Sequence, residues 1–138
     1  MAKAGDVLMS VRAPVGDINI AYEDCCIGRG LCSIRSRNGY SSYMYYLMLS
    51  LKDKLNIYNR EGTVFGAINK TTLNNMTIAK PDRSTIVVFN KVANDLDQQY
   101  LCLERQNRKL TGIRDDLLPK LMSGEIRVPV SSEVEAWW

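Results

Sequence analysis

The strongest constraint on how this chain can fold is a heptad repeat in its last third. Large apolar residues recur every seven positions from Phe89 to Leu117, and a second series starts three residues later at Val92. The nine seam positions are Phe89, Val92, Leu96, Gln99, Leu103, Gln106, Leu110, Ile113 and Leu117. Four repeats are typical of a coiled-coil helix, and about 33 helical residues would reach roughly 50 Å. A helix of that length is too long to cover a small sheet alone, so the seam is expected to be exposed until a second helix packs against it.

The end of this helix carries its own signals. Pro119 is expected to break the hydrogen-bond ladder, and Gly124 can adopt the left-handed conformation that caps a helix. The following "EIRVP" predicts a short extended piece, whereas the final "SSEVEAWW" has too little pattern to classify its two Trp. The chain is therefore expected to turn at the far end of the helix.

The first third of the chain reads as a small antiparallel sheet. Short runs of β-type residues cover Asp6–Val11, Asp17–Ala21 and Leu31–Ile34, and turn signals separate them at "APVGD", "YED" and "GRG". The next segment, "SSYMYYLMLSLKDKLNIY", places apolar residues at a spacing of four from Tyr43 to Leu55, with Ser41 or Ser42 available as a cap. An amphipathic helix packed on the sheet is expected there.

A polar region follows and precedes the long helix. It holds two glycines and a cluster of Thr and Asn, and it predicts a one-turn helix over Lys70–Asn74 whose cap is Asn69. The free amides of that turn are suited either to the Asn side chain or to a phosphate. The next run, "MTIAK", predicts a short strand that Pro81 ends.

Composition excludes several classes of function. The chain of 138 residues has room for one modest domain, contains no His, and carries 46% hydrophobic and 24% charged residues without an apolar run near the ~18 that a membrane helix needs. Its four cysteines lack zinc-ligand spacing and are expected to be buried, reduced thiols. No phosphate-binding loop, cofactor fingerprint or secretory signal is present, so we expect no catalysis, no cofactor, no metal and no membrane, and a cytoplasmic location.

Charge is distributed unevenly along the chain. The net charge is +3, and residues 1–83 contain 11 Lys and Arg against 7 Asp and Glu. Residues 84–138 contain 7 against 8. This asymmetry favours an N-terminal surface that faces a polyanion and a C-terminal element that faces protein.

Three stretches resemble a known family in order and spacing. "NRKLTGIRDDLLPKLMSGEIRV" closely resembles the C-terminal conserved segment of type I restriction-modification specificity (S) subunits. "GDVLMSVRAPVGD" looks like the opening of the second half of a target recognition domain, and "GTVFGAINKTTLNNMTIAKP" looks like the end of that domain. The family's first strands are missing, and "DRSTIVVF" after Pro81 departs from the Glu-Gln pair that many relatives carry. The resemblance thus implies a C-terminal fragment: a natural half-subunit, a truncated product or an engineered piece.

The resemblance, together with the patterns above, implies an α+β fold. A small, partial target recognition domain, β-rich and antiparallel with packed helices, would occupy residues 1–83. One long coiled-coil helix with its C-terminal turn would occupy residues 84–128, and a tail would occupy residues 129–138. In the family this helix spaces two recognition domains and docks methyltransferase subunits.

Side-chain chemistry in the basic first part and in the polar region indicates candidate DNA contacts. Arg forks onto guanine edges, Asn onto adenine, and Lys and Thr hold phosphates. The candidates are Arg12, Arg29, Arg35, Arg37, Tyr58, Asn59, Arg60, Thr63, Asn69, Lys70 and Thr71. For each of them the alternative role is that of a solvated surface residue.

Two functions remain open on the sequence alone. The first is a non-catalytic DNA sequence-recognition subunit that binds double-stranded DNA and works with methyltransferase and restriction subunits. The second is a coiled-coil assembly module without measurable DNA binding. Because this chain has one long helix where the family usually has two, a homodimer with antiparallel helices is expected, with Gln99 and Gln106 near its centre.

Overall fold

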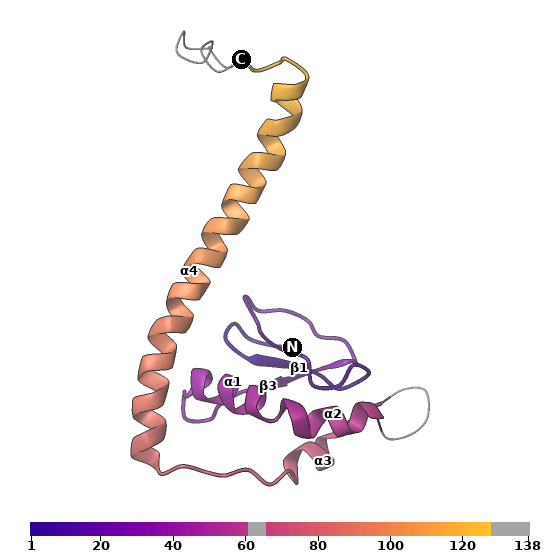
Figure 1. Cartoon of the computed structure of the whole chain (residues 1–138), viewed down its shortest axis with the longest axis vertical. Helices are drawn as coiled ribbons and strands as arrows, with labels where there is room; N and C mark the ends of the chain where they lie inside the picture. Colours follow the sequence, from indigo (N-terminus) through magenta and orange to yellow (C-terminus); the bar gives the residue numbers. More distant parts are fainter. Residues whose placement is uncertain (61–65, 128–138) are drawn as a thin grey trace, which may run out of the picture. The chain divides into compact units, whose positions relative to one another are not determined.

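The computed structural model describes residues 1–60 and 66–127, apart from the side chain of Arg60. Its contacts divide the chain into an N-terminal unit, Met1–Asp97, and a C-terminal unit, Gln98–Trp138. The described residues of the first unit form three strands and three helices, and one long helix, α4, contributes residues to both units (Figure 1). The expected α+β class, with a small antiparallel sheet and a long C-terminal helix, is confirmed.

The sheet has the order β2-β1-β3, and both of its pairings are antiparallel. Strand β1 spans Val7–Ser10, β2 spans Ile18–Ile20 and β3 spans Leu31–Ile34. Central strand β1 alternates in burial, with Val7 and Met9 buried, as expected for a strand with one face on a core. The three predicted strands are therefore present, each with the same or slightly shorter limits.

Helices α1 and α2 lie against one face of the sheet (Figure 1). The sequence predicted one continuous helix, but α1 spans Ser41–Ser50 and α2 spans Lys52–Arg60, with a turn at Leu51. The Ser50 hydroxyl donates to the Leu47 carbonyl at 2.7 Å, and the Leu51 amide bonds only three residues back, to Met48. These local bonds interrupt the i to i−4 ladder.

The start of α1 also differs from the prediction of a serine cap. Tyr40 is the N-cap and makes no side-chain cap bond, while Ser42 is buried. A free amide of the first turn, that of Tyr43, instead donates to the side-chain oxygen of Asn90 on α4 at 3.1 Å. A distant residue thus does the work expected of a local cap.

The core of the N-terminal unit lies between the sheet and these helices. Its largest fully buried side chains are Met9, Leu55, Val7 and Val15. Gly16 has a φ of +90°, and a Cβ added there would lie 2.8 Å from the Leu55 Cβ. Gly16 therefore serves both the turn after β1 and the close approach of α2.

Helix α3 spans Lys70–Asn74, as predicted, and Asn69 is its cap. The Asn69 side-chain oxygen accepts from the Thr72 amide at 2.8 Å. The predicted "MTIAK" strand is wrong, because residues 76–80 run without a strand partner. β-type composition alone does not make a strand where no neighbouring edge is available for pairing.

Helix α4 spans Arg83–Met122 and begins with a side-chain cap. The Asp82 carboxylate accepts from the Thr85 amide at 3.1 Å and from the hydroxyls of Ser84 and Thr85. These bonds hold the pKa of Asp82 well below its usual range. An acidic cap therefore starts this helix.

The first turns of α4 pack into the N-terminal unit. Ile86 and Ala93 are buried, and the ring of Phe89 meets Tyr43 and Tyr46 edge-on, at centroid distances of 6.2 and 5.8 Å. Phe89 is still 43% exposed. The first seam position is thus partly used inside its own unit, whereas the positions from Val92 onward lie on an exposed face.

The end of α4 corrects a prediction. Pro119 lies inside the helix, which continues to Met122 instead of breaking. Proline has no amide to donate to the Asp115 carbonyl four residues back, yet the helix runs on, and just past its end the Ser123 amide donates to the Pro119 carbonyl at 2.9 Å. Gly124 has the expected positive φ of 76°. Glu125 and Ile126 lie in a bend, not in the predicted extended piece, and the tail at 129–138 falls outside the described residues.

The cysteines also differ from expectation. All four are free, but Cys25 and Cys32 are only half-buried, and Cys26 and Cys102 are exposed. Desolvation raises the pKa of the Cys32 thiol above its ordinary value. The composition indicated their reduced state, but the fold decides their burial.

Candidate nucleic-acid interface

The sheet separates the four predicted arginines into two pairs. Arg12 follows the end of β1 and Arg29 precedes the start of β3, and these ends meet because Ser10 pairs with Leu31. Arg35 and Arg37 follow the other end of β3, where Ile34 pairs with Val7. The four therefore do not form one cluster.

Backbone bonds join the Arg12 end of the sheet to the polar region. The Val11 amide donates to the Gly30 carbonyl at 2.8 Å, and the Ile68 amide donates to the Val11 carbonyl at 3.0 Å. Arg12 also forms an antiparallel bridge with Ala67. Three segments that are distant in sequence thereby come together and bring with them five of the predicted contacts. We name these five, Arg12, Arg29, Asn69, Lys70 and Thr71, the sheet-end cluster; all are exposed or half-exposed.

Within this cluster Asn69 already has a structural task. Its side-chain oxygen accepts from the amide and from the hydroxyl of Thr72, at 2.8 and 2.9 Å. The sequence left open whether the amides in the first turn of α3 bond to the Asn69 side chain or to a phosphate. The Thr72 amide bonds to the Asn69 side chain. The charged side chain of Lys70 remains exposed beside it.

Arg35 lies in a tight ion pair at the other end of the sheet. Its Nε and Nη2 donate to the two carboxylate oxygens of Asp6 at 2.6 and 2.7 Å. Asp6 is buried and also accepts from the Lys3 amide and the Ser33 hydroxyl. Arg35 first, and then these hydrogen bonds, hold the pKa of Asp6 well below its usual range against the opposing effect of burial. Two of the Arg35 donors are therefore engaged within the fold.

Two of the predicted DNA contacts at the end of α2 make interactions that stabilise the fold. The Asn59 side chain accepts from the Val15 amide at 2.7 Å and donates to the Val15 carbonyl at 3.0 Å. Tyr58 is half-buried against the core. The side chain of Arg60 and the whole of Thr63 lie outside the described residues. DNA contact by these four residues stays a prediction.

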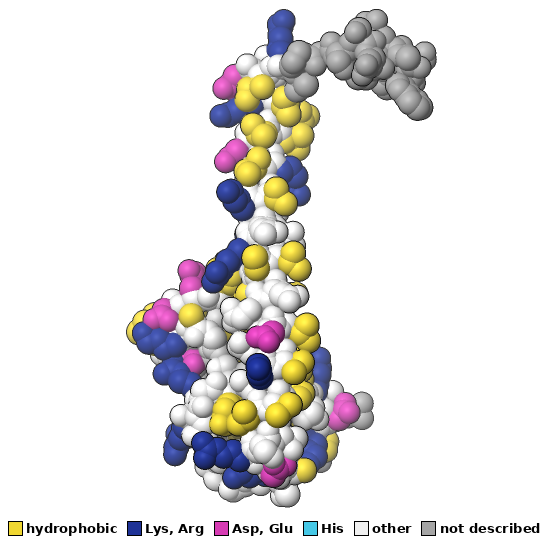
Figure 2. Space-filling model, turned by 90° about the vertical axis from the view of Figure 1, so that its left-hand side faces the viewer, with side chains coloured by type: hydrophobic (Ala, Val, Ile, Leu, Met, Phe, Trp, Pro, Cys, Tyr) yellow, Lys and Arg dark blue, Asp and Glu magenta, His cyan; other side chains and the backbone are white. Residues whose placement is uncertain are grey.

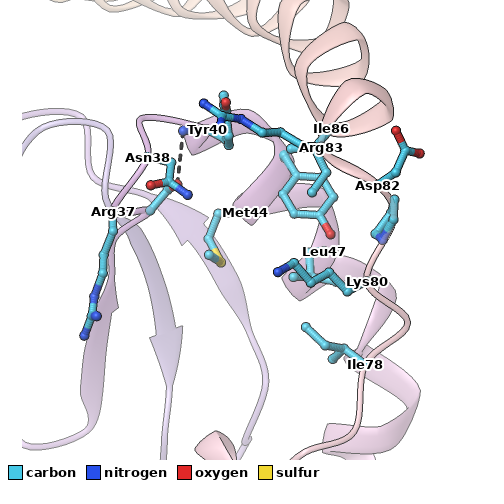
Figure 3. Close-up of a pocket in the computed structure, with 13 residues that line it drawn as sticks. Arg37, Asn38, Tyr40, Met44, Leu47, Ile78, Lys80, Asp82, Arg83 and Ile86 are labelled. Atoms are coloured by element: carbon cyan, nitrogen blue, oxygen red, sulfur yellow. Dashed lines mark hydrogen bonds between the residues drawn. The ribbon is translucent and has the colours of Figure 1, made fainter.

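Two cations outside the predicted set belong to the same cavity as Arg37. Lys80 and Arg83 help to line a cavity of about 730 Å³ in the N-terminal unit, to which Arg37 also contributes (Figure 3). Their place on either side of Pro81 and Asp82 marks the junction between the loop and α4. The sequence already shows these two basic residues close to the predicted start of the long helix, and that position could have marked them as candidate contacts.

The described part of the chain offers neither a metal site nor a membrane helix. Among residues 1–60 and 66–127 there is no group of three or more His, Cys, Asp or Glu placed to hold a metal ion. No helix in the same residues is both long and apolar enough to cross a membrane.

Known proteins similar to this chain are specificity subunits. The chain is 33% identical to the putative type I restriction enzyme MjaX specificity subunit of Methanocaldococcus jannaschii over 125 residues, which are 89% of this chain and 29% of that protein. It is 29% identical to the type I restriction enzyme HindI specificity subunit of Haemophilus influenzae, over 89% of this chain and 28% of that protein. The chain spans less than a third of either relative.

Solved structures agree with these relatives. The HsdS subunit from Thermoanaerobacter tengcongensis matches with a TM-score of 0.53 and 31% identity, over 90% of this chain and 31% of that one. A chain from a study of complex assembly and conformational transition of the type I R-M system matches with a TM-score of 0.55 and 33% identity, over 83% of this chain and 28% of that one. The family model for the type I restriction modification DNA specificity domain matches residues 2–110. With most of its length matched, the chain belongs to the type I restriction-modification DNA specificity domain family.

Proposed function

We propose that this chain is a non-catalytic DNA sequence-recognition component of a type I restriction-modification complex. The single observation that carries this proposal is the family match over residues 2–110, which includes the whole N-terminal unit apart from Met1. The similar proteins described above are named specificity subunits. A component that acts on cellular DNA would be located in the cytoplasm. Methyltransferase and restriction subunits are the partners that such a component would join.

The sheet-end cluster is the proposed DNA contact. Arg12, Arg29 and Lys70 bring three positive charges to segments that the backbone holds together, and such charges neutralise phosphates. Asn69 and Thr71 add side-chain groups that can bond to phosphate or base edges. The secondary candidates are Arg35, Arg37 and the residues at the end of α2. Arg35 and Arg37 lie at the other end of the sheet, and Arg35 and Asn59 make hydrogen bonds within the fold.

The exposed seam of α4 is the proposed dimer interface. Leu103 is 58% exposed and Leu110 62% exposed, although both are large apolar residues. Hydrophobic side chains form a stripe along the helical part of the C-terminal unit (Figure 2). Leaving such a stripe in water forgoes roughly 25 cal/mol for each Å² that a partner would cover, so a second helix is expected on it.

The order of residues along the seam supports an antiparallel partner. The order of residue types is the same in both directions from Leu103, so that reversal of a second helix brings similar residues to within one position of one another. The matched pairs are Phe89 with Leu117, Val92 with Ile113, Leu96 with Leu110, and Gln99 with Gln106. The two Gln pairs on either side of the centre are suited to fixing register and orientation.

The alternative function is an assembly module that pairs through α4 without measurable DNA binding. The observation in its favour is that Asp6 neutralises Arg35 at one end of the sheet, and that only three cations belong to the sheet-end cluster. The salt dependence of binding separates the two functions, because only a DNA-binding chain releases counterions.

We expect the unmodified chain to bind duplex DNA with an affinity that falls as salt rises. Arg12→Ala and Lys70→Ala should each flatten the plot of log affinity against log salt, by about 0.9 for every phosphate that the replaced side chain neutralises. Lys52→Ala is the control, since Lys52 is also exposed but lies on α2 outside the cluster. Fluorescence anisotropy over a salt series measures the slopes. Equal slopes for all four proteins would move the DNA contact elsewhere, and no binding at low salt would favour the assembly module.

A further inference from the structure

The cavity between the end of β3, α1 and the start of α4 has a charged rim and an apolar floor. Its volume is about 730 Å³, and all of its lining residues belong to the N-terminal unit. Met44, Leu47, Ile78 and Ile86 provide apolar surface, and Tyr40 and Tyr43 provide aromatic surface. Such a lining is suited to a large apolar side chain.

Two cations on the rim are available to a ligand. Lys80 reaches toward Met44 and Leu47, and Arg83 extends toward Tyr40 (Figure 3). Among the described residues, no hydrogen bond or ion pair to the side chain of Lys80 or Arg83 is present. Asp82 is the one acidic residue of the lining. Its carboxylate points away from the cavity and accepts hydrogen bonds from Ser84 and Thr85. The cavity therefore presents uncompensated positive charge above an apolar floor.

One segment of this chain has the complementary chemistry. "SSEVEAWW" carries two carboxylates, Glu133 and Glu135, followed by Trp137 and Trp138. These are the only Trp of the chain. A phosphate backbone would match the cations but would leave the apolar floor uncovered, whereas an acidic segment with indole rings matches both.

We propose that residues 133–138 of a second copy of this chain occupy the cavity. The two glutamates would lie near Lys80 and Arg83, and an indole ring would cover Met44 and Leu47. This docking would add a second, reciprocal contact to the proposed dimer. It rests on the proposed dimer only for the antiparallel arrangement of the two copies.

The register proposed for the dimer is why the occupant belongs to a second copy. Arg83 borders the cavity at the start of α4, which ends at Met122. In that register, which is centred on Leu103, the start of one α4 faces the end of the other, so an antiparallel neighbour would bring the residues that follow its own Met122 to this cavity.

Intrinsic fluorescence of the full chain tests the proposal, because every indole lies in the proposed ligand. Tryptophan emission should shift to the blue as the concentration rises through the dimer range. Lys80→Glu should weaken the transition by about tenfold, since one reversed charge then faces two carboxylates. Lys52→Glu is the matched control and should leave the transition unchanged. Lys80→Glu combined with Glu133→Lys and Glu135→Lys should restore it.

A second arm separates this proposal from the dimer itself. A peptide with the sequence of residues 128–138 should show the same blue shift when the Leu103→Glu chain, with both Trp replaced by Phe, is added. Binding of this peptide to the monomeric Leu103→Glu chain would support the cavity independently of the seam, and no binding would count against the cavity. Three results would overturn the proposal. They are emission typical of water-exposed indole at every concentration, a blue shift that does not depend on concentration, and a blue shift that persists in Lys80→Glu. Loss of DNA affinity in Lys80→Glu with unchanged emission would also overturn it and assign these cations to DNA.

Discussion

Leu103→Glu is expected to convert a dimer into a monomer. In the antiparallel register Leu103 faces Leu103 of the second copy, so the substitution would bury two carboxylates against each other in an apolar seam. Neither charge would have a partner, and the dimer should weaken by about a hundredfold or more. Light scattering at micromolar concentration should give twice the 15.6 kDa chain mass for the unmodified protein and a single chain mass for the variant.

Gln98→Glu is the control for this substitution. Gln98 is exposed on the same helix and lies outside the seam, so the same new carboxylate should leave the dimer intact. A single chain mass for the unmodified protein, or a dimer that survives Leu103→Glu, would show that the seam does not pair in this way.

Gly16→Ala is expected to lower the free energy of unfolding by about 3 kcal/mol. A left-handed φ costs an L residue about 1–2 kcal/mol, and the overlap with Leu55 adds a further ~1–3 kcal/mol because Leu55 is fully buried and cannot yield. Urea unfolding followed by circular dichroism measures the loss.

Gly39→Ala separates the two causes. Gly39 also has a positive φ, of 77°, but a Cβ there would have no atom within 4 Å. It should therefore show only the conformational cost of about 1–2 kcal/mol. Equal losses at Gly16 and Gly39 would mean that the approach of α2 to the turn after β1 is not a tight contact.

Elements with local signals could be predicted from the sequence. The three strands were bounded by turn residues, and α3 was recognised from Asn69 and the three residues after it, which together contain all the atoms of the cap. The long helix was recognised because its repeat continues for four heptads and does not depend on any other part of the chain.

Features that depend on residues distant in sequence could not be predicted. The Asp6 and Arg35 pair joins residues 29 positions apart, and the Asn59 and Val15 bonds join residues 44 apart. Asn90 replaces the serine expected to cap α1 from 47 residues away. In each case a polar side chain is committed by the register or packing of two elements, which one sequence does not reveal.

The candidate DNA contacts show the same division. Side-chain chemistry identified suitable residues, but strand register decides that Arg12 and Arg29 lie at one end of the sheet and Arg35 and Arg37 at the other. The bridge from Arg12 to Ala67 then brings the α3 segment to the first pair. Chemistry therefore yielded a list of candidates, and pairing between strands and loops selects the cluster within it.

Selection of bound duplexes from a random DNA library tests the central claim most directly. A specificity component that dimerises with antiparallel helices has a two-fold axis, and a symmetric dimer reads a site with the same symmetry. The account predicts enrichment of two inverted copies of one short sequence, separated by a constant number of base pairs that the paired helices set. A single motif without its inverted copy would contradict the dimer, and the absence of any enriched sequence above non-specific binding would contradict DNA sequence recognition by this chain.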